Sequence, residues 1–251
     1  MSNNSSAKDK SYLSGNSFSR RKVIHINFIC SGNTCRSYIA EAIATYLLKN
    51  IYSKKHPALK NKVIIGSAGT DVSEKIIPIN STKALDMIEI PNIKFRPKPA
   101  DKKIVKNSDL LITMATTHGR NIIEDYPEAD RTKIFNLMEL SNLVLYIQSE
   151  EIFSRNGTTR APDKSAEDNN ERAPANNVLG IAADACYSPG QVNVETIREK
   201  LKILRQMRQV AIANPPLTEV SDPFGRSIDF YAEVARLIED NIITVFNYLF
   251  E

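Results

Sequence analysis

The sequence predicts an α/β fold, a three-layer sandwich in which helices flank a four-stranded parallel sheet. Short apolar runs alternate along the chain with segments of helical periodicity, which is typical of parallel strands covered on both faces. Strands are predicted at residues 23–29, 63–65, 109–114 and, more weakly, 133–137. Helices are predicted from about residue 37, at 80–88, near 117–124 and from about 225 towards the C-terminus.

The first strand and the first helix carry the clearest pattern. The strand ends at a short polar turn, Ser31-Gly32-Asn33. From about Ser37 onward, apolar residues recur every three to four positions, as expected for a helix with one buried face. The predicted C-terminal helix shows the same period in a series of large apolar residues, namely Phe230, Val234, Leu237, Ile238, Val245 and Leu249.

Bulk composition restricts the class of protein. The chain has 251 residues, 42% hydrophobic and 25% charged, which fits one well-buried domain or one domain plus attachments. Its net charge of +4 is compatible with anionic substrates but too small to indicate nucleic acid. No apolar run is long enough for a signal peptide or a membrane span, and the three cysteines fit a reducing compartment, so a cytoplasmic location is predicted.

Two segments are predicted to lie outside the regular fold. Residues 1–21 are rich in Ser, Asn and Lys and are expected to be a disordered leader. The single domain, 22–251, is expected to contain an insertion at about 143–216. Within it, residues 154–177 have no Ile, Leu, Val, Met or aromatic residue and are expected to be disordered.

Residues 193–212 are predicted to form a basic amphipathic helix. Apolar residues recur at helical spacing between Val194 and Met207, and five basic residues occupy the remaining surface: Arg198, Lys200, Lys202, Arg205 and Arg208. The preferred interpretation is that the helix packs on its own domain with the basic residues towards water. The alternative is a docking site for an acidic partner, a substrate protein or a membrane surface.

The chemistry is concentrated between the first strand and the first helix. Cys30 ends the strand and Arg36 opens the helix, with Ser37 directly after it. The residues between Cys30 and Arg36 are small and loop-prone: Ser31, Gly32, Asn33, Thr34 and Cys35. A loop of this kind points backbone N–H groups inward at a helix N-terminus and so forms an anion-binding site. The sequence therefore predicts a phosphate-binding loop directly after the first strand.

Each residue of this loop has a plausible chemical task. The positive field should lower the pKa of the Cys30 thiol and make it nucleophilic. Arg36 offers a planar fork for two phosphate oxygens, which lysine could not match. Gly32 permits close backbone approach. The Ser37 hydroxyl could donate to the sulfur and help it leave in a later step.

At these residues the chain resembles the low-molecular-weight protein tyrosine phosphatase family. The resemblance continues at Ala40-Glu41-Ala42, at Ser67-Ala68-Gly69-Thr70, at residues 109–114 and at Asp222-Pro223-Phe224-Gly225, covering roughly 22–142 and 217–250. It implies a four-stranded parallel sheet and neither a metal nor an organic cofactor. Tyr38 departs from the family pattern, in which proline usually follows the serine, but proline there only pre-sets backbone shape.

The resemblance also implies a two-step hydrolysis of a phosphorylated protein substrate. Cys30 would attack phosphorus and form a cysteinyl-phosphate, with Arg36 and the loop amides holding the equatorial oxygens. Asp222 would protonate the leaving group and then act as base towards water. Cys35 has two interpretations, a redox partner that protects Cys30 through a reversible disulfide or a small packing residue.

Substrate choice stays open between phosphotyrosine, phosphoarginine and smaller phosphate esters. Tyrosine-directed members of the family usually carry a bulkier aliphatic residue at the position of Thr34, and a branch directed at phosphoarginine carries threonine. Thr34 and Phe224 are predicted pocket residues, and Tyr126 is a further candidate for the pocket mouth. The oligomeric state is left open by the sequence.

Two other functions compete with hydrolysis. A thiol-linked arsenate reductase on the same fold needs two further cysteines, and only Cys186 is available beyond the loop. A non-catalytic module that binds phosphoprotein would need neither the nucleophile Cys30 nor the acid Asp222.

Overall fold

The computed structural model describes residues 22–73, 75–155, 192–211 and 219–251, and these contain a four-stranded sheet. The strands are β1 (Ile24–Cys30), β2 (Val63–Gly69), β3 (Leu110–Thr113) and β4 (Ile134–Asn136), in the order β2-β1-β3-β4. All neighbouring strands are parallel. The predicted fold class is confirmed. In the described part of the chain, no helix combines the length and apolarity needed to cross a membrane.

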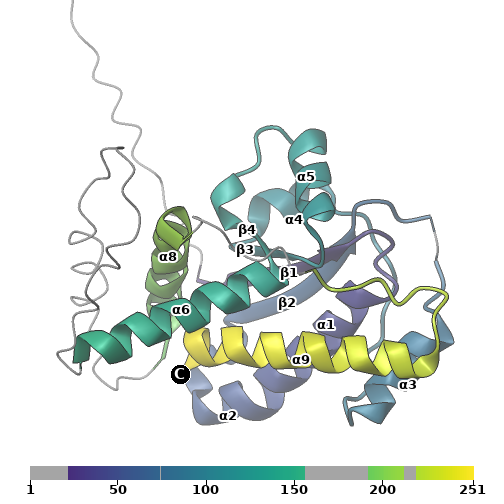
Figure 1. Ribbon diagram of the computed structural model, residues 1–251, viewed down its shortest axis with the longest axis horizontal. Coiled ribbons are helices and arrows are strands. Elements are labelled where there is room, and N and C mark those ends of the chain that lie inside the picture. The colour runs from purple at the N-terminus through teal and green to yellow at the C-terminus, as the bar shows by residue number, and fades with distance from the viewer. Residues whose placement is uncertain (1–21, 74, 156–191, 212–218) are drawn as a thin grey trace, which may run out of the picture.

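One face of the sheet carries the larger core. The side chains of Ile24, Ile26 and Phe28 point to it from β1. It is covered by α1 (Arg36–Leu47), α3 (Ile79–Met87), α6 (Leu137–Arg155) and α9 (Ile228–Phe250), below the sheet in Figure 1. Three short helical segments follow α1, at Leu48–Tyr52, α2 (Ser53–Lys55) and Pro57–Leu59, and a fourth, Arg131–Lys133, directly precedes β4. Residues of α9 between Tyr231 and Phe250 supply much of the buried surface.

The other face is covered by α4 (Lys102–Asn107) and α5 (Thr116–Asp125), above the sheet in Figure 1. A smaller core lies here, with Ile29 and Leu111 from the sheet and Ile122 from α5. Successive residues of a strand point to opposite faces, so Phe28 and Ile29 serve different cores. The result is the predicted three-layer arrangement.

The strand register gathers three loop starts at one edge. Cys30 pairs with Gly69 at the ends of β1 and β2, and Ile29 pairs with Thr113 at the end of β3. Because parallel strands all end on the same side, the loops that follow them meet there. This edge carries the candidate site.

The structure differs from the prediction at residues 143–155, which were assigned to the insertion. They form the second half of α6, including Ser154 and Arg155, for which disorder was expected. Leu140, Val144 and Ile147 are buried because they recur at helical spacing along the face that meets α9. The leader 1–21 and residues 156–177 lie outside the described residues.

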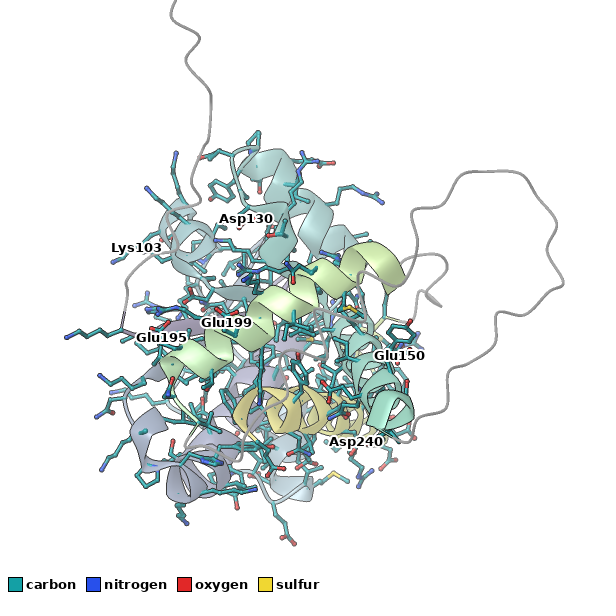
Figure 2. The ribbon with its side chains drawn as sticks, turned by 90° about the vertical axis from the view of Figure 1, so that its left-hand side faces the viewer. Lys103, Asp130, Glu150, Glu195, Glu199 and Asp240 are labelled. Carbon is teal, nitrogen blue, oxygen red and sulfur yellow. The ribbon has the colours of Figure 1, made fainter. Side chains whose placement is uncertain are left out.

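Helix α8 (Val194–Ala211) buries an apolar stripe against the domain: Ile197, Leu201, Leu204 and Met207. It crosses the amino-terminal edge of the sheet, the end of the molecule that faces the viewer in Figure 2, with Glu195 and Glu199 exposed. The expectation that its basic residues all face water is wrong, since Arg198 is only 8% exposed. Arginine is long enough to lay its stem on apolar surface and still reach a partner.

Two further arginines of α8 bind the sheet directly. Arg205 donates to the carbonyl of Asp109, the residue before β3, over 2.8 Å. Arg208 donates to the carbonyl of Ile134 at the start of β4 and to both carboxylate oxygens of Glu139. The helix is thereby fastened to the ends of two strands.

Candidate active site

The loop of residues 30–36 joins β1 to α1 at the carboxyl edge of the sheet. Asn33 has a φ of 56°, in the left-handed region that asparagine tolerates better than most residues. Its side chain is fully buried beneath the loop, where Oδ1 accepts from the backbone N–H of Lys98 over 3.0 Å. The Asn33 amide therefore has a fixed orientation.

That orientation decides the direction of the hydrogen bonds around the sulfur. Asn33 Nδ2 donates to Ser37 Oγ over 2.9 Å and to Ser67 Oγ over 2.7 Å. Ser67 in turn donates to Glu41. Ser37 Oγ lies 2.9 Å from Cys30 Sγ, and once Cys30 is a thiolate, which can only accept, the Ser37 hydroxyl donates to it. The predicted contact of Ser37 with the sulfur is present, within a network that holds the loop from below.

Gly69 at the end of β2 lets the sheet approach the loop closely. A Cβ at this position would lie 2.2 Å from the carbonyl oxygen of Ser31 and 3.0 Å from the backbone nitrogen of Asn33. Both are backbone atoms and cannot move aside cheaply. The approach is used by two loop hydrogen bonds, from Thr70 N to Cys30 O and from Asp71 N to Ser31 O.

Burial raises the pKa of the Cys30 thiol, and this outweighs the hydrogen bonds from Ser37 and Asn33 and the charge of Arg36, which lower it. The predicted lowering of this pKa is therefore wrong for this structure. The physical reason is desolvation of the sulfur, because Cys30 as a whole residue is only 3% exposed.

Arg36 is buried, at 6% exposure, and binds the segment that precedes α9. One terminal nitrogen donates to Val220 O over 3.2 Å, and the other forms an ion pair with Asp222 Oδ2 over 2.7 Å. Its Nε is buried and has no hydrogen-bond partner among the described residues. A buried N–H without a partner is rare in folded proteins and indicates a place where an acceptor belongs.

The Asp222 segment is shaped by its proline and glycine. Arg226 N donates to Pro223 O, and Gly225 has a φ of 75°, which is a turn that favours glycine at this position. Phe224 N donates to Asp222 Oδ1, and the Phe224 ring is 62% exposed. Figure 1 shows this segment, in yellow-green, leading to the start of α9 at the end of the sheet where the strands finish.

Thr34 and Cys35 lie on the inner side of the loop. Thr34 is 6% exposed, and its Oγ1 lies 3.8 Å from Cys35 Sγ. Cys35 Sγ also lies 3.5 Å from the hydroxyl of Tyr231 in α9. Both Cys30 and Cys35 are free thiols. Cys186 lies outside the described residues.

His118 in α5 is a site residue that the sequence reasoning missed. Its Nδ1 accepts the backbone N–H of Ala115 over 3.1 Å, so the proton of the neutral ring is on Nε2. Nε2 lies 3.0 Å from Ser31 Oγ and donates to it. Burial lowers the pKa of His118 to about 4, with a further contribution from the charge of Arg36. The signal in the sequence was a histidine in the first turn after the third strand.

Tyr126 does not join the site. It follows α5 and packs against the smaller core under α4 and α5. The helix places it about 15 Å along its axis from Thr116, where α5 begins near the loop. The interpretation of Tyr126 as part of the pocket mouth is therefore wrong.

Comparison with known proteins identifies similar chains. A family model described as low molecular weight phosphotyrosine protein phosphatase matches residues 25–146. The low molecular weight protein-tyrosine-phosphatase PtpB of Staphylococcus haemolyticus is 28% identical over 116 residues, which are 46% of this chain and 73% of that protein.

Solved structures show the same fold at low identity. A YwlE mutant from Bacillus subtilis has a TM-score of 0.52 at 20% identity, with 91% of this chain and 99% of that chain covered. A YwlE arginine phosphatase with a phosphorylated active-site serine has a TM-score of 0.52 at 19% identity, with 89% of this chain and 94% of that chain covered. A phosphotyrosine phosphatase from Vibrio cholerae O395 gives 0.53 at 16%, covering 89% and 95%.

Proposed function

We propose that this chain is a low molecular weight phosphotyrosine protein phosphatase, the family whose model matches residues 25–146, and that it hydrolyses phosphotyrosine or phosphoarginine in proteins through a cysteinyl-phosphate. The observation that carries the proposal is the buried, unpartnered Nε of Arg36. It lies in the same seven-residue loop as a cysteine that accepts hydrogen bonds from Ser37 and from the loop backbone. A phosphoryl group supplies the missing acceptor and is the electrophile for this sulfur.

In the first step the Cys30 thiol passes its proton to the Asp222 carboxylate that Arg36 has released, the thiolate attacks phosphorus, and an S–P bond forms as the bond to the leaving oxygen or nitrogen breaks. The three equatorial oxygens are held by loop N–H groups and by Arg36. Asp222 gives its proton to the leaving atom. The protein product departs without the phosphoryl group.

In the second step water attacks the cysteinyl-phosphate and the S–P bond breaks. Asp222 takes the proton from water, and inorganic phosphate is released. Ser37 donates to the sulfur throughout, which stabilises the thiolate as it leaves.

The Arg36–Asp222 ion pair gives the cycle a switch between two partners. Arg36 cannot donate fully to a phosphoryl group and to the carboxylate with the same N–H groups. Binding of the substrate dianion therefore competes with Asp222 for the guanidinium. Once the guanidinium turns to the phosphoryl oxygens, the Asp222 carboxyl is available to carry the proton.

Thr34 is the residue on which the choice of substrate rests. Its small polar side chain is buried beside the sulfur of Cys35, and a bulkier aliphatic residue is usual in tyrosine-directed relatives. Phe224 provides an exposed aromatic wall next to Asp222 that suits a planar phenyl or guanidinium group. These features support phosphoarginine and phosphotyrosine alike, so both are tested. A nucleophile that must stay reduced also supports the cytoplasmic location.

The test is phosphate release from matched phosphoarginine and phosphotyrosine peptides, with a small aryl phosphate as a third substrate and Cys30→Ser as control. The expected result is turnover of at least one peptide by the wild type and none by the control. Absence of turnover on all substrates, with vanadate still bound in the loop, would overturn hydrolysis in favour of phosphoprotein binding.

A further inference from the structure

The loop between α3 and α4 carries a short alternating segment, residues 94–98. Lys94, Arg96 and Lys98 are exposed, and the residues between them, Phe95 and Pro97, are partly buried. Within the described residues none of the three cations forms an ion pair. We call these three side chains the cationic rim.

The backbone of this segment is held extended by its prolines. Pro97 follows Arg96 and Pro99 follows Lys98, and a residue before proline is excluded from the helical region. In an extended chain, alternate side chains point the same way and lie about 7 Å apart. The backbones of Arg96 and Lys98 are therefore restricted, and the exposed side chains of Lys94, Arg96 and Lys98 alternate with the partly buried Phe95 and Pro97.

The carboxyl-terminal end of the segment is fastened to the phosphate-binding loop. Lys98 N donates to Asn33 Oδ1, the same oxygen that orients the loop asparagine. The carbonyl of Lys98 accepts from Gly69 N over 2.9 Å, and Ala100 N donates back to Gly69 O over 2.8 Å. Lys98, at one end of the rim, is therefore hydrogen-bonded directly to Asn33 of the phosphate-binding loop.

The amino-terminal end is fastened to the start of α1 by Tyr38, the residue that departs from the family pattern. The Tyr38 hydroxyl donates to Asn92 Oδ1 over 2.9 Å, and its ring meets Phe95 edge-on at 4.8 Å. Tyr38 is 1% exposed and follows Ser37 directly. The segment is thus attached at one end to the phosphate-binding loop and at the other end to α1, the helix that follows this loop.

We propose that the cationic rim binds acidic side chains next to the phosphorylated residue of the protein substrate, so that the enzyme prefers phosphoresidues with acidic neighbours. This inference rests on the proposed function. An extended peptide presents alternate side chains at the same spacing of about 7 Å, so two acidic residues two positions apart match two rim cations. The row is hydrogen-bonded to the phosphate-binding loop through Lys98 N and Asn33, so it lies on a segment adjoining the proposed phosphate site.

The acidic groups near the rim do not neutralise it. The Asp86 carboxylate accepts from Asn92 Nδ2 rather than from a rim cation. The charge of Lys98 acts on Glu41 and lowers its pKa, although burial raises that pKa overall. Lys94 and Arg96 are accordingly the two cations most available to a peptide.

The experiment compares three phosphopeptides that differ only in the flanks, with Glu, Gln or Lys at the second and fourth positions on either side of the phosphoresidue. The readout is kcat/KM for each peptide divided by kcat/KM for a small aryl phosphate. For the wild type, Glu flanks are expected to exceed Gln flanks by about 3- to 20-fold, as for a few solvent-exposed ion pairs. The ratio should shrink as salt is added.

In K94E/R96E the order of the Glu and Lys peptides is expected to reverse. The matched control is K54E/K60E, which makes the same charge change at exposed lysines around α2, remote from the loop. The control should keep the wild-type order. If wild-type turnover is normal but indifferent to the flanks, the rim proposal is overturned and the phosphatase stands.

Failure of the proposed function has a different signature, since the wild type would then turn over neither peptides nor the aryl phosphate. Binding of anionic vesicles or of RNA by the wild type, lost in K94E/R96E without any effect of peptide flanks, would also overturn the proposal, because the row would then serve another class of partner.

Discussion

The Arg36 guanidinium and the Asp222 carboxylate form an ion pair 2.7 Å long, although 186 positions separate the two residues in the chain. The pair joins the phosphate-binding loop to the segment before α9. Arg36 is buried and Asp222 is half exposed, so the carboxylate can be replaced as partner by an incoming anion.

Asp222→Asn separates binding from catalysis. The amide cannot donate a proton as an acid, so turnover of substrates with poor leaving groups should fall by about 10²- to 10⁴-fold. Vanadate should bind to this variant at least as tightly as to the wild type, because the Arg36 guanidinium no longer has to break an ion pair with residue 222 in order to bind the anion. Steady-state kinetics and a vanadate titration check both parts. Weaker vanadate binding would mean that the ion pair does not compete with the anion.

Ser37→Ala removes the hydroxyl that donates to Cys30 Sγ. A hydrogen bond to a charged group contributes about 1.5–3 kcal/mol, so steps that need the thiolate should slow by about 10- to 100-fold. The second step, in which sulfur leaves, should be affected, and rapid-quench measurements would show accumulation of the phosphoenzyme. Ser53→Ala in α2 is a control that should behave as the wild type. An unchanged second step would place the donor elsewhere.

Gly69→Ala tests the close approach of β2 to the loop. Its Cβ would collide with backbone atoms of Ser31, and such overpacking costs about 1–3 kcal/mol of unfolding free energy. Phosphate affinity should fall with it because the loop must shift. Gly119→Ala is the matched control: its Cβ would meet neighbours at 3.4 Å or more, and alanine should stabilise α5 by about 0.5–1 kcal/mol. Urea denaturation measures both, and equal stability of the two variants would contradict the prediction.

His118 predicts a pH dependence of stability. Burial lowers its pKa to about 4 in the folded protein, against 6.5 when unfolded. Below pH 6.5 the unfolded chain binds a proton that the folded protein does not, so stability falls as pH decreases from 6.5 to about 4. At about 1.4 kcal/mol per pKa unit the loss is on the order of 3 kcal/mol.

His118→Asn lacks this titration, so the difference in unfolding free energy between wild type and variant should change with pH over that window. Denaturant titrations at pH 7.5, 6 and 4.5 measure it. A difference that is constant with pH would show that the pKa of His118 is the same in the folded and unfolded states, and so that Nδ1 takes up a proton and no longer accepts the N–H of Ala115 below about pH 6.5.

Arg208→Ala tests whether α8 is a structural part of the domain. The guanidinium binds both oxygens of Glu139, donates to Ile134 O and lies 4.5 Å from the Phe135 ring centroid. Removing it leaves a largely buried carboxylate, which should cost about 2–3 kcal/mol of unfolding free energy. Lys202→Ala on the exposed side of α8 should change it by less than about 0.5 kcal/mol. Thermal and urea unfolding measure both variants. If Arg208→Ala lowered the unfolding free energy as little as Lys202→Ala does, α8 would be a peripheral attachment rather than a structural part of the domain.

The parts of the fold that could be predicted were those with a strong local period. The strand before Cys30 and the stripe from Ile197 to Met207 show the spacing of buried faces, and both elements are present. The second half of α6 was assigned to an insertion because the family resemblance covers only residues 22–142 and 217–250, although Val144 and Ile147 lie on its buried face. Periodicity locates a buried face well and the end of a helix poorly.

The candidate site divides in the same way. The sequence by itself determined the loop from Cys30 to Ser37, because a strand, a short loop and a helix N-terminus are contiguous and shape one another locally. Only the tertiary structure decided that His118 supports Ser31, that Asp222 is paired with Arg36, that burial raises the Cys30 pKa and that the arginines of α8 bind the sheet. These contacts depend on strand register and helix packing between distant segments, and desolvation depends on everything that surrounds a group, so no local pattern of residues encodes them.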